Sequence, residues 1–226
     1  MELNGKLVVA IDGPAGAGKS TVARQVAKEL GYIYIDTGAM YRALTLKALR
    51  LGTGLFDEPA LTKMVQETDI RLVYRDFTQV IFMDNEDVSS EIRLPVVSQN
   101  VSYVAKVSGV RLEMVRLQRE LAKAGGVIMD GRDIGSYVLP DANCKIYLTA
   151  STAERASRRA KDLEAAGIEV NLGQLEKEIA IRDEIDSTRE MAPLIKAPDA
   201  VLIDSSDLNF EQVVNLIKKN ILENCS

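Results

Sequence analysis

The chain has 226 residues and a formal net charge of −5, and hydrophobic and charged residues make up 46% and 27% of it. This balance is typical of a soluble globular protein with one large α/β domain or a core with small insertions. The net negative charge argues against a protein that holds nucleic acid by bulk positive charge. No apolar run approaches the roughly 18 residues of a membrane-spanning helix.

Histidine is absent from the chain, and cysteine occurs only twice. The first absence excludes Ser-His and Cys-His nucleophiles and argues against a protein zinc site. Cys144 and Cys225 lie far apart in the sequence and fit no metal-ligand spacing, so we expect two reduced thiols in a cytoplasmic protein. Residues 1–6 contain no apolar core of a signal peptide, which agrees with that location.

The most informative stretch is residues 7–30. Five consecutive apolar residues, 7–11, predict a strand that is buried on both faces. Apolar residues between Val22 and Leu30 recur at helical spacing and predict a helix. The eight residues 13–20, GPAGAGKS, stand between the two elements and match the phosphate-loop pattern G-x-x-x-x-G-K-S/T. The flanking strand and helix favour a true phosphate loop over a glycine-rich turn that matches by chance.

The composition of this loop suits a nucleoside triphosphate. Glycines allow backbone N–H groups to point at a phosphate chain, and the following helix adds further donors and the positive end of its dipole. Lys19 can reach the β- and γ-phosphates, and the hydroxyl of Ser20 can ligate Mg²⁺.

The next segments continue the alternation of strand and helix. A short strand at 32–35 precedes a helix over 39–51, which Gly52 ends. Asp57 begins a second, short helix that has Pro59 in its first turn.

Residues 69–83 change the pattern, because apolar and polar residues alternate in two runs. The turn Asp76-Phe77-Thr78 separates these runs, and a further turn follows at 84–86. The pattern predicts a small antiparallel sheet of two or three strands over about 69–89. Because it interrupts the alternation of strand and helix, we expect an insertion outside the main sheet.

The rest of the chain returns to alternating strands and helices. The predicted strands are 127–130, 145–149 and 200–204, and the predicted helices are 89–93, 96–102, 109–124, 152–166, 173–190 and 209–222.

Four of the predicted strands end in a carboxylate, at Asp12, Asp36, Asp130 and Asp204. Ligands of an open parallel sheet gather at the carboxyl ends of its strands, where an aspartate can hold water, Mg²⁺ or a hydroxyl. The alternative for each is a turn or a helix cap, a role that aspartate also fills well. The residues that follow favour a cap for Asp204 and a functional role for Asp36 and Asp130.

Two further groups of charged residues follow these strands. Arg42 lies in the first turns of its helix and can bind a second phosphate, although a solvated helix arginine is the alternative. Residues 130–133, DGRD, place two carboxylates and one arginine in one turn. Arginine can bind phosphate with two hydrogen bonds, and aspartate can accept from an amino group.

Two helices carry the remaining candidates. Arg182, Asp186 and Arg189 share one helix face, which is either the wall of a cleft or an exposed ladder of ion pairs, and spacing alone slightly favours the ladder. Arg155, Arg158 and Arg159 form a basic patch whose default interpretation is a solvated face. On a mobile segment they could instead close over phosphates and stabilise the charge of a phosphoryl group in transfer.

A phosphate loop with a second cationic site indicates phosphoryl transfer between two phosphorylated ligands rather than hydrolysis. The absence of an N-K-x-D motif argues against a GTPase.

Five segments in this order resemble the bacterial cytidylate kinases (CMP/dCMP kinases), of the P-loop nucleoside monophosphate kinase family, over nearly the whole chain. The segments are IDGPAGAGKST (11–21), DTGAMYRA (36–43), VSGVR (107–111), DGRDIGS (130–136) and RDEIDSTR (182–189). Residues 69–89 are similar to the extra small sheet of the bacterial enzymes. Thr37 stands where some members carry Ser, and Ser136 where Thr is common; both exchanges keep a hydroxyl group.

The resemblance implies an α/β fold of the P-loop NTPase type, with a five-stranded parallel sheet of order 2-3-1-4-5 flanked by helices. It also implies a monophosphate-binding insert that contains the small antiparallel sheet, and a helical lid. The whole chain, 1–226, would form a single cytidylate kinase domain. Its parts would be a core (1–36, 109–151 and 191–226), an insert at about 37–108 and a lid at about 152–190.

The activity that the resemblance implies is ATP-dependent phosphorylation of CMP and dCMP to CDP and dCDP, with Mg²⁺, in pyrimidine nucleotide metabolism. It implies a cytoplasmic monomer whose partners are ATP and CMP or dCMP, without nucleic acid or membrane. The ATP-binding residues would be Gly13, Pro14, Ala15, Gly16, Ala17, Gly18, Lys19, Ser20 and Thr21, with Ser20 on Mg²⁺ together with phosphate oxygens and water.

The resemblance assigns roles to the other candidates as well. Arg42 and Arg132 would contact the acceptor phosphate. The residues around cytosine would be Thr37, Arg111, Asp133 and Arg189, and those on the sugar hydroxyls Ser102, Arg182 and Asp186. The catalytic residues would be Lys19, Arg132 and the lid residues Arg155, Arg158 and Arg159.

The chemistry of cytosine agrees with these roles. Asp133 can accept a hydrogen bond from the amino group, and Arg111 can donate to the ring acceptors. Uracil has a carbonyl in place of the amino group and would leave the carboxylate unpaired, which discriminates strongly. The alternatives are another small-molecule kinase with a phosphate loop, acting on UMP, AMP or shikimate, and a nucleotide-dependent switch protein.

Overall fold

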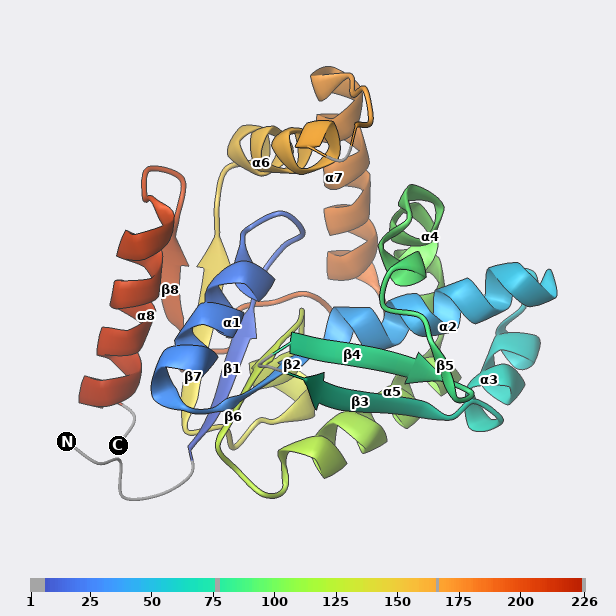
Figure 1. Ribbon diagram of the computed structural model, residues 1–226, viewed down its shortest axis with the longest axis horizontal. Coiled ribbons are helices and arrows are strands. Elements are labelled where there is room, and N and C mark those ends of the chain that lie inside the picture. The colour runs from blue at the N-terminus through green and yellow to red at the C-terminus, as the bar shows by residue number, and fades with distance from the viewer. Residues whose placement is uncertain (1–6, 76–77, 166, 225–226) are drawn as a thin grey trace. The chain divides into compact units, whose positions relative to one another are not determined.

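The computed structural model describes residues 7–75, 78–165 and 167–224 (Figure 1). The segment 1–6, the turn residues Asp76 and Phe77, the last residue of the helix predicted at 152–166, and Cys225 lie outside the described residues. The chain divides into two compact units. Unit 1 comprises Met1–Tyr34, Ala124–Thr188 and Ala192–Ser226, and unit 2 comprises Ile35–Lys123 and Arg189–Met191. The division into core, insert and lid stays a prediction.

A five-stranded parallel sheet organises the fold, in the order β2 (Ile33–Asp36), β6 (Val127–Asp130), β1 (Val8–Asp12), β7 (Cys144–Thr149) and β8 (Val201–Asp204). This arrangement confirms the predicted order 2-3-1-4-5. The apolar run of β1 is buried because the strand pairs with β6 on one side and with β7 on the other. In this register Asp130 lies opposite Ile11, and Asp12 lies opposite Tyr147, so Asp12 and Asp130 end at the same edge.

Two helices of unit 1 cover the sheet and share a core with it. Helices α1 (Lys19–Leu30) and α8 (Phe210–Asn224) pack against each other. Their buried side chains, among them Val26 and Ile217, join those of the central strands. This packing fixes the start of α1, and with it the phosphate loop, against the carboxyl end of β1.

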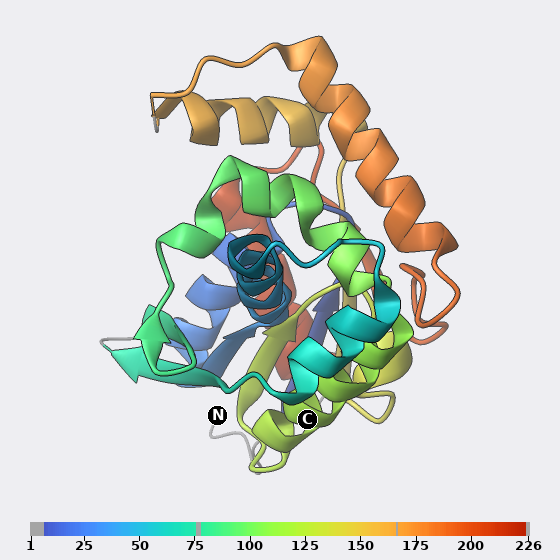
Figure 2. The same ribbon diagram turned by 90° about the vertical axis from the view of Figure 1, so that its right-hand side faces the viewer.

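The rest of unit 1 includes a helix pair and an irregular turn. Helices α6 (Thr152–Ala165) and α7 (Leu172–Thr188) pack against each other and are drawn in yellow-orange and orange in Figure 2. The segment Ile134–Val138 forms a single π-helical turn, η2, which follows β6. The sequence did not predict this turn.

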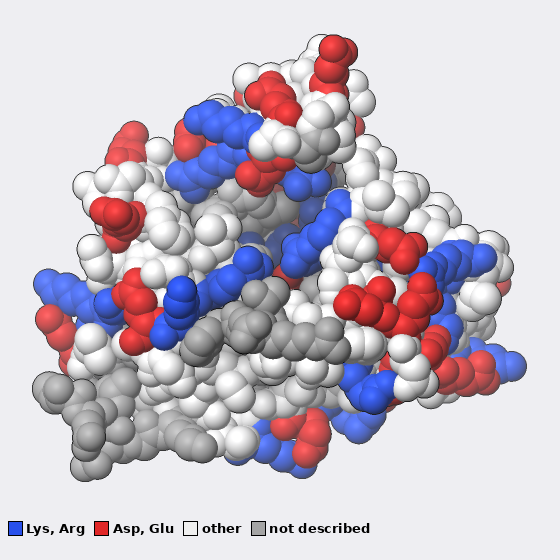
Figure 3. All heavy atoms as spheres, viewed as in Figure 1, with Lys and Arg blue, Asp and Glu red and all other residues white. Residues whose placement is uncertain are grey.

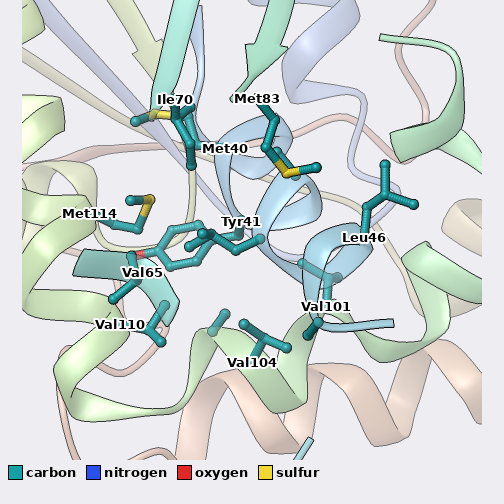
Figure 4. Packing of buried hydrophobic residues seen from close by; sticks show 14 of the residues in the cluster. Met40, Tyr41, Leu46, Val65, Ile70, Met83, Val101, Val104, Val110 and Met114 are labelled. Carbon is teal, nitrogen blue, oxygen red and sulfur yellow. The ribbon is translucent and has the colours of Figure 1, made fainter. Parts of the chain in front are cut away.

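Unit 2 has its own small sheet and its own helices. Antiparallel strands β3 (Ile70–Arg75), β4 (Thr78–Met83) and β5 (Glu86–Asp87) confirm the predicted insertion at 69–89. The helical elements are α2 (Thr37–Leu51), α3 (Glu58–Gln66), the 3₁₀ turn η1 (Glu91–Arg93), α4 (Pro95–Ala105) and α5 (Ser108–Ala122). Their apolar faces form one core, in which Met40, Val101 and Met114 are among the buried residues (Figure 4).

The local sequence explains several boundaries of these helices. The carboxylate of Asp36 accepts a hydrogen bond from the Ala39 N–H at 2.8 Å and caps α2, and Gly52 ends that helix in a left-handed conformation. Asp57 caps α3 in the same way through the Ala60 N–H, as its position before Pro59 predicts.

The described residues place side chains of both charges on the surface of the molecule. On the face drawn in Figure 3, Lys and Arg side chains lie among Asp and Glu side chains. Among the residues that the structure describes, no helix is long and apolar enough to cross a membrane.

Candidate active site

The phosphate loop of unit 1 has a backbone that only glycine permits. Gly13, Gly16 and Gly18 have φ angles of +144°, +77° and +86°. A Cβ atom on Gly13 would lie 1.9 Å from the carbonyl oxygen of Leu148, and one on Gly16 would lie 3.0 Å from Cβ of Arg155. The glycines of the motif therefore serve close packing of the loop as well as its curvature.

Lys19 is buried at the start of α1, directly above this loop. Its Nζ donates to the carbonyl oxygen of Pro14 at 2.7 Å, and an ammonium group has further donors for phosphate oxygens. Burial, together with the nearby charges of Arg132 and Arg182, lowers the pKa of Lys19, against the opposing effect of Asp130 and Asp12. Lys19 is therefore a buried ammonium group that is held by the backbone of the loop.

Asp130 orients Ser20 at the other side of the loop. The Ser20 hydroxyl donates to Oδ2 of Asp130 at 2.9 Å, and the Tyr34 hydroxyl donates to Oδ1 at 2.8 Å. Within the described ranges, no group of three or more acidic or cysteine side chains is placed to hold a metal. A hydroxyl and a carboxylate are nevertheless the hard oxygen donors that Mg²⁺ prefers, so they suit a metal that is also held by nucleotide phosphates. Tyr34 has no signal in the sequence, where it reads as an ordinary strand residue.

Asp12 uses its carboxylate in a different way. Oδ1 accepts from the Ile134 N–H and Oδ2 from the Gly135 N–H, both at 2.7 Å. Burial raises the pKa of Asp12 to about 7, although the two N–H groups favour the charged form. Of the two sequence interpretations, the structure therefore supports a backbone cap for Asp12.

Arg132 and Asp186, both predicted to bind CMP, meet in unit 1. Nε of Arg132 lies 3.0 Å from Oδ2 of Asp186, and both side chains are largely buried. Burial opposes the positive charge, but the carboxylates of Asp186, Asp130 and Asp183 outweigh it and raise the pKa of Arg132. Arg132 is therefore a fixed cation beside Lys19. For Asp186 the structure disfavours the alternative of an exposed ladder, since only 4% of this residue is exposed.

Two arginines of α6 contact the nucleotide-binding part of unit 1. Arg155 is buried and donates to the carbonyl oxygens of Ala15 and Ala150, both at 3.0 Å, and it also pairs with Asp183 of α7 at 2.6 Å. Arg158 donates to the carbonyl oxygen of Ser205 at 2.6 Å. These contacts are incompatible with a merely solvated basic face for Arg155 and Arg158. Arg159 is half-buried.

In unit 2, the carboxylate of Asp36 forms ion pairs with two arginines. Its Oδ2 lies 3.1 Å from Nη2 of Arg42 and 3.0 Å from Nη2 of Arg93. Burial favours the neutral acid, yet the charges of Arg42 and Arg93 prevail and hold the pKa of Asp36 below its usual range. The sequence interpretation did not include Arg93, because no local pattern links it to a residue 57 positions earlier.

The other candidates of unit 2 are mostly buried polar residues. Arg111 is 1% exposed; its Nη1 donates to the carbonyl oxygen of Ala105 at 3.1 Å, and its Cζ lies 5.5 Å from the ring centre of Tyr41. Thr37 and Ser102 are also buried. Of the residues predicted to bind CMP, unit 1 contains Arg132, Asp133, Arg182 and Asp186, and unit 2 contains Thr37, Arg42, Ser102, Arg111 and Arg189. Their joint assignment to CMP stays a prediction.

Comparison with known proteins identifies the family. The family model described as "Cytidylate kinase" matches residues 9–223. A cytidylate kinase of Bacillus pumilus (strain SAFR-032) is 56% identical over 212 residues, which are 94% of each chain. A cytidylate kinase of Pediococcus pentosaceus is 51% identical over 224 residues, or 99% of each chain.

A solved structure supports the fold alone. A shikimate kinase from Bacteroides thetaiotaomicron superposes with a TM-score of 0.50 at 14% identity, over 96% of this chain and 98% of that one. Together with the phosphate loop, the strand order and the small sheet, the near full-length match to the family model shows that the chain belongs to the cytidylate kinase family.

Proposed function

We propose that this enzyme transfers the γ-phosphoryl group of ATP to CMP or dCMP and releases ADP with CDP or dCDP. The observation that carries this proposal is the phosphate loop, with Lys19 bound to its backbone and Arg132 fixed in the same unit, in a chain whose residues 9–223 match the cytidylate kinase family. A loop for one phosphate chain, with a further buried arginine, suits a reaction between two phosphorylated substrates.

The donor is held by unit 1. Backbone N–H groups of residues 13 and 15–21, at the loop and the start of α1, bind the phosphates of ATP, and Lys19 adds a positive charge. Ser20 and Asp130 would hold Mg²⁺ together with phosphate oxygens and water. Mg²⁺, when bound, would neutralise part of the negative charge of the phosphates. Arg155, Arg158 and Arg159 stabilise the group in transfer and help to exclude water.

The acceptor phosphate is held by Arg42 and Arg132, which orient its attacking oxygen. A phosphate monoester has a second pKa near 6, so this oxygen is already largely ionised at neutral pH. No strong general base is then required, which agrees with a chain that lacks histidine.

Cytosine is selected by hydrogen bonds. Asp133 accepts from the amino group, and Arg111 donates to the ring acceptors, with Thr37 and Arg189 completing the set. The sugar hydroxyls are bound by Ser102, Arg182 and Asp186. The burial of Asp133 and Arg111 supports these roles, since a buried polar group discriminates well against a base that leaves it unpaired.

We also propose that the enzyme acts in the cytoplasm as a monomer. Cys144 is buried in β7, and a chain of 226 residues with only two cysteines suits a reducing compartment.

An assay coupled to ADP release, run with CMP, dCMP, UMP, AMP and shikimate in turn, tests the proposal. We expect turnover with CMP or dCMP far above that with the other acceptors. Turnover with AMP or UMP but not with CMP would refute the assignment. ADP release that is independent of any acceptor would favour a nucleotide-dependent switch instead.

A further inference from the structure

Asp12 is a buried carboxylate to which the proposed function gives no task. It is the last residue of β1 and directly precedes Gly13 of the phosphate loop. Only 4% of it is exposed, and both of its carboxylate oxygens accept backbone hydrogen bonds at 2.7 Å. A carboxyl group that is buried so completely and bonded at both oxygens has a defined position.

The two N–H groups that Asp12 holds belong to Ile134 and Gly135, the residues that directly follow Asp133. The carbonyl oxygen of Asp133 is fixed as well, because the N–H groups of Tyr137 and Val138 donate to it at 2.9 Å and 3.0 Å. Asp12 therefore caps the start of η2, although it lies 122 positions before Ile134 in the chain. The two sets of hydrogen bonds leave the backbone at Asp133 little freedom.

Asp133 lies beside this cap, because it directly precedes Ile134, whose N–H donates to Oδ1 of Asp12 at 2.7 Å. The turn also packs closely against Lys145, since a Cβ atom on Gly135 would lie 3.1 Å from Cγ of that residue. A shift of Asp12 or of Gly135 would thus be transmitted to Asp133.

We propose that Asp12 is a positioning residue for base specificity: by capping the peptide N–H groups of Ile134 and Gly135, it fixes the carboxylate of Asp133 for the amino group of cytosine. This inference rests on the proposed function, in which Asp133 reads that amino group. Asp12 itself touches neither substrate in this account and acts through the backbone of the turn.

The test is the CMP-to-UMP ratio of kcat/KM at saturating ATP, measured for the wild type and for Asp12→Asn. Asparagine keeps the size of the side chain but presents an NH₂ group to one of the two N–H donors, so one hydrogen bond is lost. We expect the ratio to fall by about tenfold to a hundredfold, the range that a misplaced binding group causes. Effects on ATP binding cancel in this ratio, and a general loss of folded enzyme would lower both rates equally.

Asp57→Asn is the matched control. Asp57 also accepts a backbone hydrogen bond at the start of a helix, from Ala60 at 3.0 Å, but it belongs to no predicted site. Its ratio should equal that of the wild type. A second variant, Asp12→Glu, keeps the carboxylate but moves it by one methylene group away from its position on the N–H groups of Ile134 and Gly135. It should also lower the ratio, which keeps the proposal testable if Asp12→Asn does not fold.

The outcomes separate this inference from the proposed function. If the wild type itself does not prefer CMP to UMP, the proposed function fails. If the wild type prefers CMP and a folded Asp12→Asn or Asp12→Glu enzyme retains the full ratio, the role of Asp12 is refuted and the proposed function stands.

Discussion

Aspartates at strand ends have different partners in the two units of the molecule. In unit 1, aspartates at strand ends bind backbone and hydroxyl groups: Asp12 caps the turn at 134–138, and Asp130 binds Ser20 and Tyr34. In unit 2, arginines are held by side chains of their own unit, as Arg42 is by Asp36 and Arg111 by the ring of Tyr41.

Backbone donors and side-chain-oriented arginines suit different groups of the substrates. Backbone N–H groups and a glycine loop bind the phosphate chain that all nucleoside triphosphates share, and they carry no information about a base. Buried arginines that are oriented by side chains form directional hydrogen bonds, which distinguish one acceptor from another. The predictions below change one arrangement at a time.

The largest effect is expected at the loop of unit 1. Lys19→Met removes the buried cation above the loop, and we expect kcat to fall about a thousandfold, since stabilisation of the transferring charge is lost. KM for CMP should change little. Steady-state rates with each substrate varied will check this, with Lys28→Met, on the exposed side of the same helix, as the control. A variant with an unchanged kcat would contradict the role of Lys19.

A smaller effect is expected at Arg42 of unit 2. Arg42→Gln removes a charged hydrogen-bond donor from the acceptor phosphate, and such a bond contributes about 1.5–3 kcal/mol. KM for CMP should therefore rise by roughly ten- to a hundredfold, while KM for ATP stays near the wild-type value. Arg50→Gln is the control, because Arg50 lies on the same helix but pairs with Glu86 and Glu91. A rise in KM for ATP of the same size would remove the distinction between binding of the acceptor and binding of the donor.

Stability of unit 2 depends on a close approach between two of its helices. A Cβ atom on Gly109 would lie 2.2 Å from Oγ1 and 2.8 Å from Cβ of Thr62, so Gly109→Ala must displace α5 from α3. We expect the free energy of unfolding to fall by about 1–3 kcal/mol, as is usual for overpacking. Urea unfolding followed by circular dichroism measures it. The double variant Thr62→Ser, Gly109→Ala should recover only part of this stability, because Cβ of residue 62 remains in the way. A Gly109→Ala protein as stable as the wild type would refute the close contact.

The smallest effect concerns an exposed ion pair of unit 2. Burial opposes ionisation of Asp84, but the hydrogen bonds from Lys47 and from the Asp69 N–H together outweigh it and lower the pKa of Asp84. A lowered pKa gives a contribution to stability that is present above pH 4 and is lost as the pH falls through the lowered value. Asp84→Asn keeps a residue that tolerates the φ of +51°, so it should cost about 0.5 kcal/mol at pH 7 and progressively less as the pH falls below about 4. A cost that is independent of pH would exclude the ion pair as its cause.

The sequence predicted local elements in both units, but it did not predict contacts between residues that are far apart in the chain. The strand, loop and helix of residues 7–30 are a local pattern, and the resemblance to cytidylate kinases supplied the strand order that the structure confirms. The small sheet at 69–89 followed from alternation alone. The sequence did not predict the contact of Tyr34 with Asp130 or that of Arg93 with Asp36. The first joins residues 96 positions apart and the second joins residues 57 positions apart, so neither produces a local pattern.

The turn at 134–138 was missed for a related reason. A single π-helical turn has no sequence pattern of its own, and its cap, Asp12, comes from a strand far away in the chain. The two sequence interpretations of Asp12, ligand or cap, could be distinguished only once the register of β1 and β6 placed the two segments at one edge of the sheet.

The central claim is that recognition of the acceptor base and binding of the donor are separate tasks, and Asp133→Ala tests it most directly. Isothermal titration of this variant with CMP and, separately, with ATP and Mg²⁺ measures both affinities. The account predicts that the affinity for CMP falls by about a hundredfold, the loss of a charged hydrogen bond, while the affinity for ATP stays within about twofold. Equal loss of both affinities, or an unchanged affinity for CMP, would contradict it.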